Sequence, residues 1–407
     1  MVQLKRVSTA LVAVLALSGC AWLTRSSVSG APQLAQANAQ SRNPSISGSG
    51  RFVAFTSDAT NLVANDTNAK SDVFVHDNVS GATERISVAS NGSQADGPSY
   101  GPSISDNGRY VAFTSDATNL AADADAVSDV FVRDRTNGTT TLVSVKDDET
   151  AMLVPAEQPV ISGDGRSVAF MTRETRLVVD IPPLPALPYG PFVRNLDAES
   201  TRLMPLQSLQ NLLVANQYDL SDDGRRIVYT LINVYGLVSN VIAADTTDGT
   251  VFGTTGITTI IPDNSNTTPV AISGDGTKFV FVLNPTAGNP SLTMAPVLTP
   301  ASPTLVKSVP RTSAVFLSQD ASTIGAQIRF GAEDIAVVSQ ASVESLWTIV
   351  SASADGKHAV GSHGSAMSAD GAWFAFVSND PTLVLSDTNG VDDVFTRSVA
   401  KQLTPPS

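Results

Sequence analysis

Three short acidic stretches carry residue types and spacings that suit a metal site. The runs are Asp66-x-Asn68-x-x-x-Asp72, Asp123-x-Asp125-x-x-x-Asp129 and Asp387-x-Asn389-x-x-x-Asp393. Such runs hold hard oxygen atoms close together, as Ca²⁺ requires. The same residue types also stabilise ordinary turns through hydrogen bonds to their own backbone. Two interpretations therefore stay open, a calcium site that clamps loops without catalysis and plain turn chemistry.

Residues that could carry catalysis are sparse in this sequence. Its three histidines are His76, His358 and His363, and two of them lie close together. His76 falls in a predicted strand, at a position where exposure to solvent is expected. Two histidines without a third ligand make a weak metal site, so a structural or solvated role is favoured. The sequence has no G-x-S-x-G, H-E-x-x-H or P-loop motif, and it assigns no catalytic residue.

The acidic stretches belong to a larger repeat built around an S-x-D-G turn. Its copies begin at Ser47, Ser105, Ser162, Ser221, Ser273 and Ser368, with a worn copy at Ser318 that has Ala321 in place of glycine. Glycine after aspartate or asparagine tolerates the positive φ of a tight turn between antiparallel strands. The residues after each turn are rich in Val, Phe, Tyr and Ala, which favours a strand. Successive turns are 45 to 59 residues apart, a spacing typical of propellers.

Repeats one and two are almost duplicates and show the internal order of a repeat. Both contain V-A-F-T-S-D-A-T-N-L, at 53–62 and 111–120, followed by D-V-F-V at 72–75 and 129–132. A short strand before the turn and another after a second turn give four strands. The sequence thus predicts an all-β fold, a seven-bladed β-propeller of four-stranded antiparallel blades over residues 41–407. In the seventh repeat, 402–404 is the expected fourth strand.

The repeat resembles a known group of propeller repeats. S-x-D-G-[RK]-x-[VI]-[AV]-[FY] followed by D-[VI]-[FY]-V-x-D is similar to the PD40 repeats of TolB-like, WD40-like propellers. The resemblance covers roughly 41–404 and implies the propeller fold. TolB-type proteins also carry an α/β domain before the ring, whereas here the ring follows a short leader. The resemblance therefore does not assign a TolB role in envelope maintenance.

The first residues read as an export signal. Lys5 and Arg6 precede an apolar run at 7–17, which is too short to span a bilayer. Leu17-Ser18-Gly19-Cys20 then resembles the bacterial lipobox, which implies a signal peptide at 1–19 and lipidation of Cys20. Residues 20–40, rich in Ser, Ala and Gln, are expected to form a flexible tether. Localisation is predicted at the bacterial cell envelope, on the outer membrane if the host is Gram-negative.

The charge of the chain bears on its partners. The net charge is −13, and loss of residues 1–19 would leave 23 basic and 38 acidic residues, or −15. Such a surface repels phosphate backbones, so nucleic acid is not expected as a partner. The predicted function is a monomeric, non-enzymatic binding or scaffold module for an envelope protein or a glycan. The acidic loops of repeats seven, one and two would form an arc facing that partner. The alternative is a polysaccharide hydrolase or lyase with its site in the central funnel.

Overall fold

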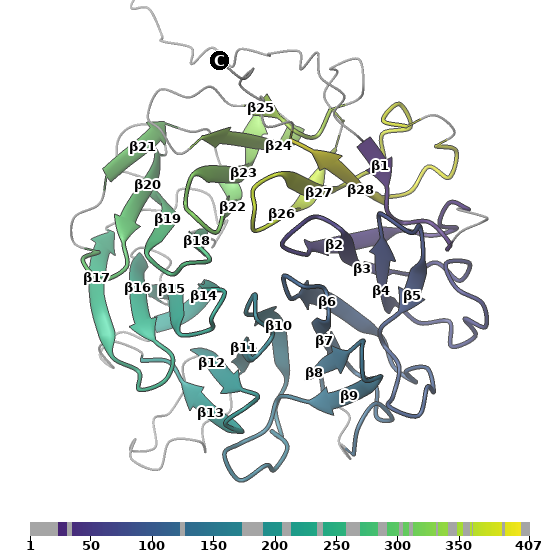
Figure 1. Cartoon of the computed structure of the whole chain (residues 1–407), viewed down its shortest axis with the longest axis horizontal. Helices are drawn as coiled ribbons and strands as arrows, with labels where there is room; N and C mark the ends of the chain where they lie inside the picture. The colour runs from purple at the N-terminus through teal and green to yellow at the C-terminus, as the bar shows by residue number, and fades with distance from the viewer. Residues whose placement is uncertain are drawn as a thin grey trace, which may run out of the picture.

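The structure is a computed structural model of the whole chain. It describes residues 23–30, 35–122, 127–172, 190–205, 213–233, 239–257, 269–283, 291–300, 304–308, 312–330, 333–340, 348–352, 359, 361–384 and 387–399. The regular elements in these ranges are all β-strands, and they form four-stranded antiparallel sheets arranged around a central axis (Figure 1). Among these residues no helix is long and apolar enough to cross a membrane.

Six of the sheets are blades built from four strands that follow one another in the chain. Blade one is β2 (Ser41–Ile46), β3 (Phe52–Ser57), β4 (Asp72–Asp77) and β5 (Thr83–Arg85). Blade two is β6 (Ser99–Ile104), β7 (Tyr110–Ser115), β8 (Asp129–Asp134) and β9 (Thr139–Leu142). Blade three is β10 (Ala156–Ile161), β11 (Ser167–Thr172), β12 (Gly190–Asn195) and β13 (Ser200–Leu203).

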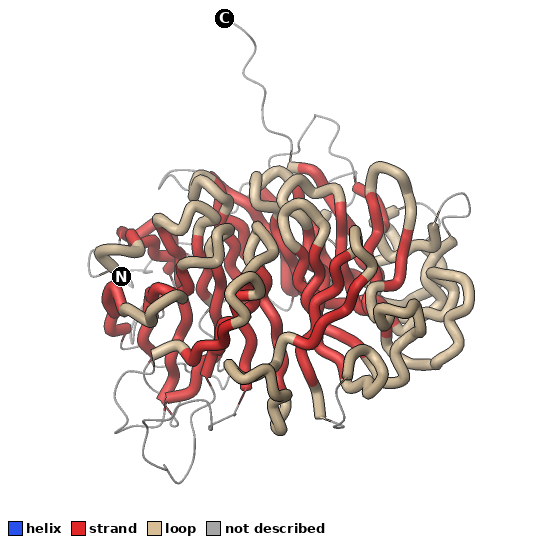
Figure 2. Tube along the Cα trace, turned by 60° about the horizontal axis from the view of Figure 1, so that its bottom comes forward, coloured by secondary structure: helices blue, strands red, loops and turns tan. Residues whose placement is uncertain are grey.

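The next three blades repeat this order. Blade four is β14 (Leu213–Leu220), β15 (Arg226–Asn233), β16 (Ser239–Asp245) and β17 (Val251–Ile257). Blade five is β18 (Val270–Ile272), β19 (Lys278–Leu283), β20 (Ser291–Pro296) and β21 (Thr304–Ser308). Blade six is β22 (Thr312–Leu317), β23 (Thr323–Phe330), β24 (Glu333–Gln340) and β25 (Thr348–Ile349). In each blade the first strand lies nearest the axis (Figure 1). The strands run at a steep angle to the plane of the ring (Figure 2).

The remaining four-stranded sheet, here named the closing blade, joins the two ends of the described chain. Its strands are β26 (His363–Met367), β27 (Trp373–Ser378), β28 (Asp393–Ser398) and β1 (Leu23–Arg25). β1 pairs antiparallel with the outer side of β28, with Leu23 opposite Arg397 and Arg25 opposite Phe395. The ring is therefore closed by a strand from the beginning of the chain.

This arrangement corrects two expectations from the sequence. The prediction of seven blades formed in chain order by residues 41–407 is wrong. That stretch supplies six complete blades and only three described strands of the closing blade. A flexible tether over 20–40 is also wrong for the described part, where 23–30 and 35–40 are ordered against the closing blade and blade one. Hydrogen bonding to the free edge of β28 outweighs the chain entropy that the composition favours. The expected strand at 402–404 lies outside the described residues.

The S-x-D-G turns connect the first and second strands of the blades and bond to one another around the axis. Each turn donates a backbone N–H to a carbonyl of the next turn, over 2.7 to 3.2 Å. The donor–acceptor pairs are Gly48–Asp106, Asp106–Gly163, Asp164–Asp222, Asp222–Gly274, Asp275–Gln319, Gln319–Ala369 and Asp370–Gly48. The last pair links the closing blade to blade one, so the ring of hydrogen bonds is complete.

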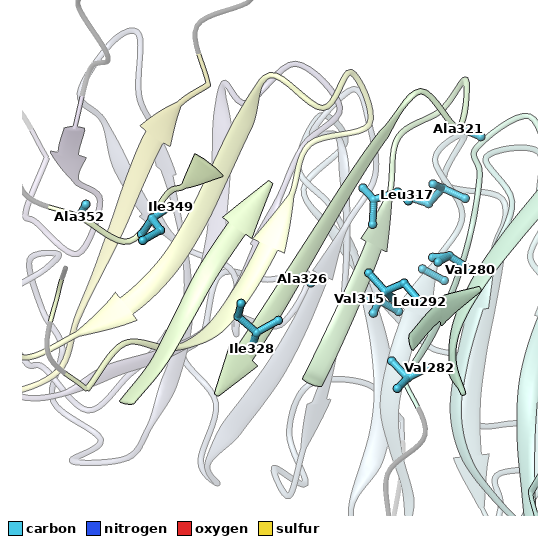
Figure 3. Packing of buried hydrophobic residues seen from close by; sticks show 12 residues of the cluster. Val280, Val282, Leu292, Val315, Leu317, Ala321, Ala326, Ile328, Ile349 and Ala352 are labelled. Atoms are coloured by element: carbon cyan, nitrogen blue, oxygen red, sulfur yellow. The ribbon is translucent and has the colours of Figure 1, made fainter. Parts of the chain in front are cut away.

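The core lies between the blades, because both faces of the second and third strands are buried. Val53, Ala54 and Phe55 of β3 have no exposed surface. Opposed phenylalanines on these strands stack at 5.8 to 6.0 Å in four blades. The pairs are Phe55–Phe74, Phe113–Phe131, Phe170–Phe192 and Phe376–Phe395. Figure 3 shows one interface, where Val280 and Leu292 of blade five belong to one apolar cluster with Val315 of blade six. A single blade could not bury these faces alone.

Candidate functional site

The acidic loop of blade one encloses an arginine. The Arg85 guanidinium, on β5, lies 3.4 Å from Asp66 and 3.2 Å from Asp72. The Asn68 amide also donates to Asp72, over 3.2 Å. All three charged side chains are at most 9 % exposed. A guanidinium therefore occupies the place where the sequence suggested a calcium ion.

The closing blade repeats this arrangement with residues from both ends of the chain. Arg25 of β1 lies 3.2 Å from Asp387 and 3.2 Å from Asp393. The Asn389 amide donates to Asp393 over 3.0 Å, as Asn68 does to Asp72. Arg25 and Arg85 occupy matching positions, since each lies opposite the phenylalanine of the adjacent third strand. Burial raises the pKa of Asp393, against hydrogen bonding from Ser27 and the charge of Arg25.

Blade two departs from this pattern at the arginine position. Leu142 lies opposite Phe131, where the other two blades have arginine. Asp129 accepts a hydrogen bond from Ser144 over 2.6 Å, while Asp123 and Asp125 lie outside the described residues. In the ranges that the structure describes, no group of three His, Cys, Asp or Glu side chains is placed to hold a metal ion. The calcium interpretation therefore stays a prediction for the loop at 123–129 alone.

The expected acidic arc is not a charged surface in the described loops. Asp66 and Asp387 are each 2 % exposed, and Asp72 and Asp393 are fully buried. Their charges face arginines inside the molecule and are screened from any partner. Docking of a basic surface on these four carboxylates is thus ruled out by their burial.

The histidines also differ from expectation. His76 is 5 % exposed, so the prediction that it faces solvent is wrong. Its Nδ1 lies 2.8 Å from the Thr83 hydroxyl, and burial lowers its pKa to about 4, which keeps the ring neutral at pH 7. His363 is half exposed and lies 3.6 Å from Asp392. His358 and Cys20 lie outside the described residues.

Three carboxylates near the axis have perturbed acidities. Asp106 and Asp222 come from turns of blades two and four and meet over Gly163, where a Cβ would lie 2.5 Å from Asp106 and 3.0 Å from Asp222. Burial and the neighbouring Asp106 raise the pKa of Asp222 to about 6. Desolvation raises the pKa of Asp219 to about 7, although Ile272 and Leu220 donate backbone N–H groups to it. Asp219 and Asp222 are therefore partly protonated near neutral pH.

An open groove of the described chain lies between blades three and four, on the side of the S-x-D-G turns. Two adjoining cavities of about 440 Å³ and 390 Å³ share Ser167, Asn195, Thr246 and Thr247. The first is also lined by Arg202 and the second by Arg166 and Arg225. We name this feature the interblade groove. Its size is in the range of small-molecule and side-chain binding sites.

The preceding interfaces explain why the groove exists. Between blades one and two the ring of Phe52 fills the corresponding place, with Arg51 and Arg135 over it at 4.7 and 4.4 Å. Between blades two and three the ring of Tyr110 does the same, beneath Arg109 at 4.7 Å. Each ring packs on the turn glycine of the next blade. Blade three has Ser167 at this position, so the ring is missing.

Sequence reasoning did not detect the groove. The signal was present in the repeat: the residue after the arginine of S-x-x-G-R is aromatic in repeats one and two and is Ser167 in repeat three. The signal gains meaning only when the structure shows that this side chain lies between two blades. A repeat motif describes one blade, whereas the groove belongs to a pair.

Comparisons with known proteins agree with the propeller fold. No family model matches the sequence, and no curated protein matches it. Among solved structures, oligogalacturonate lyase from Vibrio parahaemolyticus superposes with a TM-score of 0.56 at 10 % identity, over 94 % of this chain and 99 % of that one. The Cps50 (Swd1) β-propeller domain of Myceliophteria thermophila gives 0.53 at 12 % identity, over 89 % and 97 %.

TolB from Acinetobacter baumannii is also among the structural neighbours. It gives a TM-score of 0.42 at 12 % identity, and the match covers 76 % of this chain and 63 % of that one. At these identities the likeness shows the fold alone. The chain is a β-propeller, the fold that the repeat motif suggested.

Proposed function

We propose that this chain is a non-enzymatic binding propeller of the bacterial cell envelope, which holds a protein or glycan partner. A rigid ring of blades is a scaffold on which loops and clefts can be presented. The anchor would be a lipid on Cys20, three residues before β1. In that case the outer edge of the closing blade would lie beside the membrane.

The observation that carries this proposal is the interblade groove. Its lining comes mainly from the turns after β10 and β12 and from β13 in blade three, and from the turns after β14 and β16 in blade four. Hydroxyl, amide, carboxylate and guanidinium groups line it. These groups can recognise a partner without rearrangement of the ring, and such preorganisation lowers the cost of binding.

A pull-down tests the binding function. The full chain with Cys20→Ser, immobilised on a resin, should capture envelope protein or glycan in a saturable manner. The control is a resin carrying an unrelated acidic protein of similar size. Recovery of nothing saturable would contradict the proposal.

A separate experiment tests the anchor. Wild-type chain expressed in a bacterial host should incorporate labelled fatty acid and sediment with the membrane fraction. Cys20→Ser should remove both properties. An unlabelled wild-type chain would rule out the lipid anchor while leaving the binding function open.

A pair of carboxylates near the axis favours the enzymatic alternative. Asp106 and Asp222 are neighbouring carboxylates with raised pKa, a property of general acids in glycoside hydrolysis. A polysaccharide hydrolase or lyase would require degradation of a defined polymer that Asp222→Asn abolishes. Polymer chain length measured with the wild type and this variant decides the matter. Equal chain lengths would eliminate the alternative.

A further inference from the structure

We propose that the interblade groove is a slot for an aromatic side chain of a partner polypeptide, with an acidic residue beside it. This inference rests on the proposed binding function and specifies its partner. The evidence for it comes from two other interfaces between blades of this chain. Two neighbouring interfaces of the same ring show which group fits at this position, since Phe52 and Tyr110 fill it there.

Three positions that close the other interfaces are changed together at the groove. The ring position holds Ser167 instead of Phe52 or Tyr110. The position opposite the ring holds Asn195, where the first two blades have Asp77 and Asp134. The covering position on the following blade holds Thr246, where Arg135 and Leu196 stand in the earlier interfaces. Each change removes volume or charge from the same place.

These changes release Arg166 from the partners that its equivalents have. Arg51 binds both carboxylate oxygens of Asp77, over 3.0 and 2.8 Å, and lies over Phe52. Arg109 binds Asp134 in the same way and lies over Tyr110. Among the residues that the structure describes, Arg166 pairs with Asp197 alone, at 3.5 Å, and both side chains are about two-thirds exposed. Its guanidinium is thus available to cover a ring supplied by a partner.

Two arginines of the groove can receive an acidic residue next to that ring. Arg202 and Arg225 line it and are exposed, and neither forms an ion pair with another residue that the structure describes. Four carboxylates also line the groove, and one of them, Asp197, faces Arg166. Asp164 accepts hydrogen bonds from Ser162 and the Arg166 amide, Asp223 accepts them from Ser221 and the Arg225 amide, and Asp147 accepts one from the Thr201 amide. Arg202 and Arg225 have no carboxylate within ion-pair distance among the described residues, so each can pair with a partner carboxylate.

The test uses small probes and the full chain with Cys20→Ser. The probes are p-cresol, which is the tyrosine side chain, and the peptides acetyl-Glu-Tyr-Gly-amide, acetyl-Lys-Tyr-Gly-amide and acetyl-Glu-Leu-Gly-amide. Affinities are measured by NMR or calorimetric titration. The Glu-Tyr peptide should bind at least about tenfold more tightly than the other two. Equal affinity for the Glu-Leu peptide would overturn the aromatic slot, and equal affinity for the Lys-Tyr peptide would overturn the acidic neighbour.

Variants locate the binding. Ser167→Tyr supplies the missing ring and Thr246→Arg supplies the missing cover, and each should abolish binding of p-cresol without lowering the melting temperature. Val79→Tyr adds the same ring at a position that is 77 % exposed and should leave binding intact. Phe52→Ser should create a second p-cresol site between blades one and two. Unchanged p-cresol binding in both groove variants would overturn the proposal.

Competition with a sugar tests whether the partner is a polypeptide. Competition with cellohexaose, a neutral oligosaccharide, should leave peptide binding unchanged, and displacement of the peptide by the sugar would overturn a polypeptide partner. If the groove variants still capture envelope material in the pull-down, the inference fails while the binding function stands. If the wild type captures nothing yet binds p-cresol, the slot exists and the proposed function fails.

Discussion

The guanidinium of Arg25 lies 3.2 Å from the carboxylate of Asp393, so a residue at the start of the described chain is paired with one near its end. Asp387 completes the contact at 3.2 Å. Arg85 makes the same contacts inside blade one, with Asp66 and Asp72. The same arrangement, an arginine between two aspartates, joins neighbouring strands within blade one and joins the two ends of the described chain in the closing blade.

Replacement of Arg25 by leucine, the residue that blade two has at this position, should destabilise the fold. Two buried carboxylates would lose their cation, which costs about 3 kcal/mol in the free energy of unfolding. Urea unfolding followed by circular dichroism measures the loss. The triple variant Arg25→Leu, Asp387→Asn, Asp393→Asn should recover most of the stability. No change in the single variant would show that the pairing contributes nothing to closure.

Deletion of residues 1–30 should open the ring at β28. The strand would lose its partner β1 and the bond from Ser27 to Asp393, and its exposed edge would pair with other chains. We expect a lower melting temperature and aggregation in light scattering. Deletion of residues 1–21, which retains β1, is the matched control and should melt like the full chain. Equal behaviour of both deletions would mean that another segment closes the blade.

Stability should depend on pH through Asp219. Its pKa is raised in the folded state, to about 7, so the folded protein favours the protonated form. The stabilisation is fully present below the ordinary pKa of 3.8 and is lost as the pH rises through about 7. Ser45 and Ser103 occupy the corresponding position in blades one and two and accept the same backbone N–H of the next blade.

Asp219→Ser should therefore stabilise the protein at pH 8 and not at pH 4. The expected gain is on the order of 2 kcal/mol, since one pKa unit corresponds to about 1.4 kcal/mol and the side chain is partly hydrated. Chemical denaturation of both proteins at the two pH values measures it. A gain of equal size at both values would point to a packing effect.

Calcium should act only through the loop at 123–129. Arginines already occupy the corresponding place in blade one and the closing blade, whereas blade two has Leu142 there. Saturating calcium is expected to raise the melting temperature by about 5 °C. Asp125→Asn should remove this shift and Asp387→Asn should not. Identical melting with calcium and with chelator would contradict the calcium interpretation and leave turn chemistry.

The sequence predicted the local structure of each repeat well, because turn glycines and alternating apolar residues act over a few positions. The turn at Gly108 and the strands around Val111 and Val130 lie where the motif placed them. The closure by β1 was not predictable, since three residues, Leu23 to Arg25, carry no repeat signal. Their strand forms only because β28 offers an unpaired edge hundreds of residues later.

The sequence by itself determined that this chain is a ring of four-stranded blades, since one hairpin-rich motif recurs along it and no single copy can bury both of its faces. Only the tertiary structure decided which groups the acidic loops bind and between which blades a groove lies. Arg85 and Arg25 neutralise carboxylates that read as a calcium site, because pairing across strands depends on register. The groove at Ser167 exists because blade three lacks the ring and blade four lacks the cover that close the earlier interfaces. Contacts between blades join residues that are distant in the chain, so the sequence of one repeat does not show them.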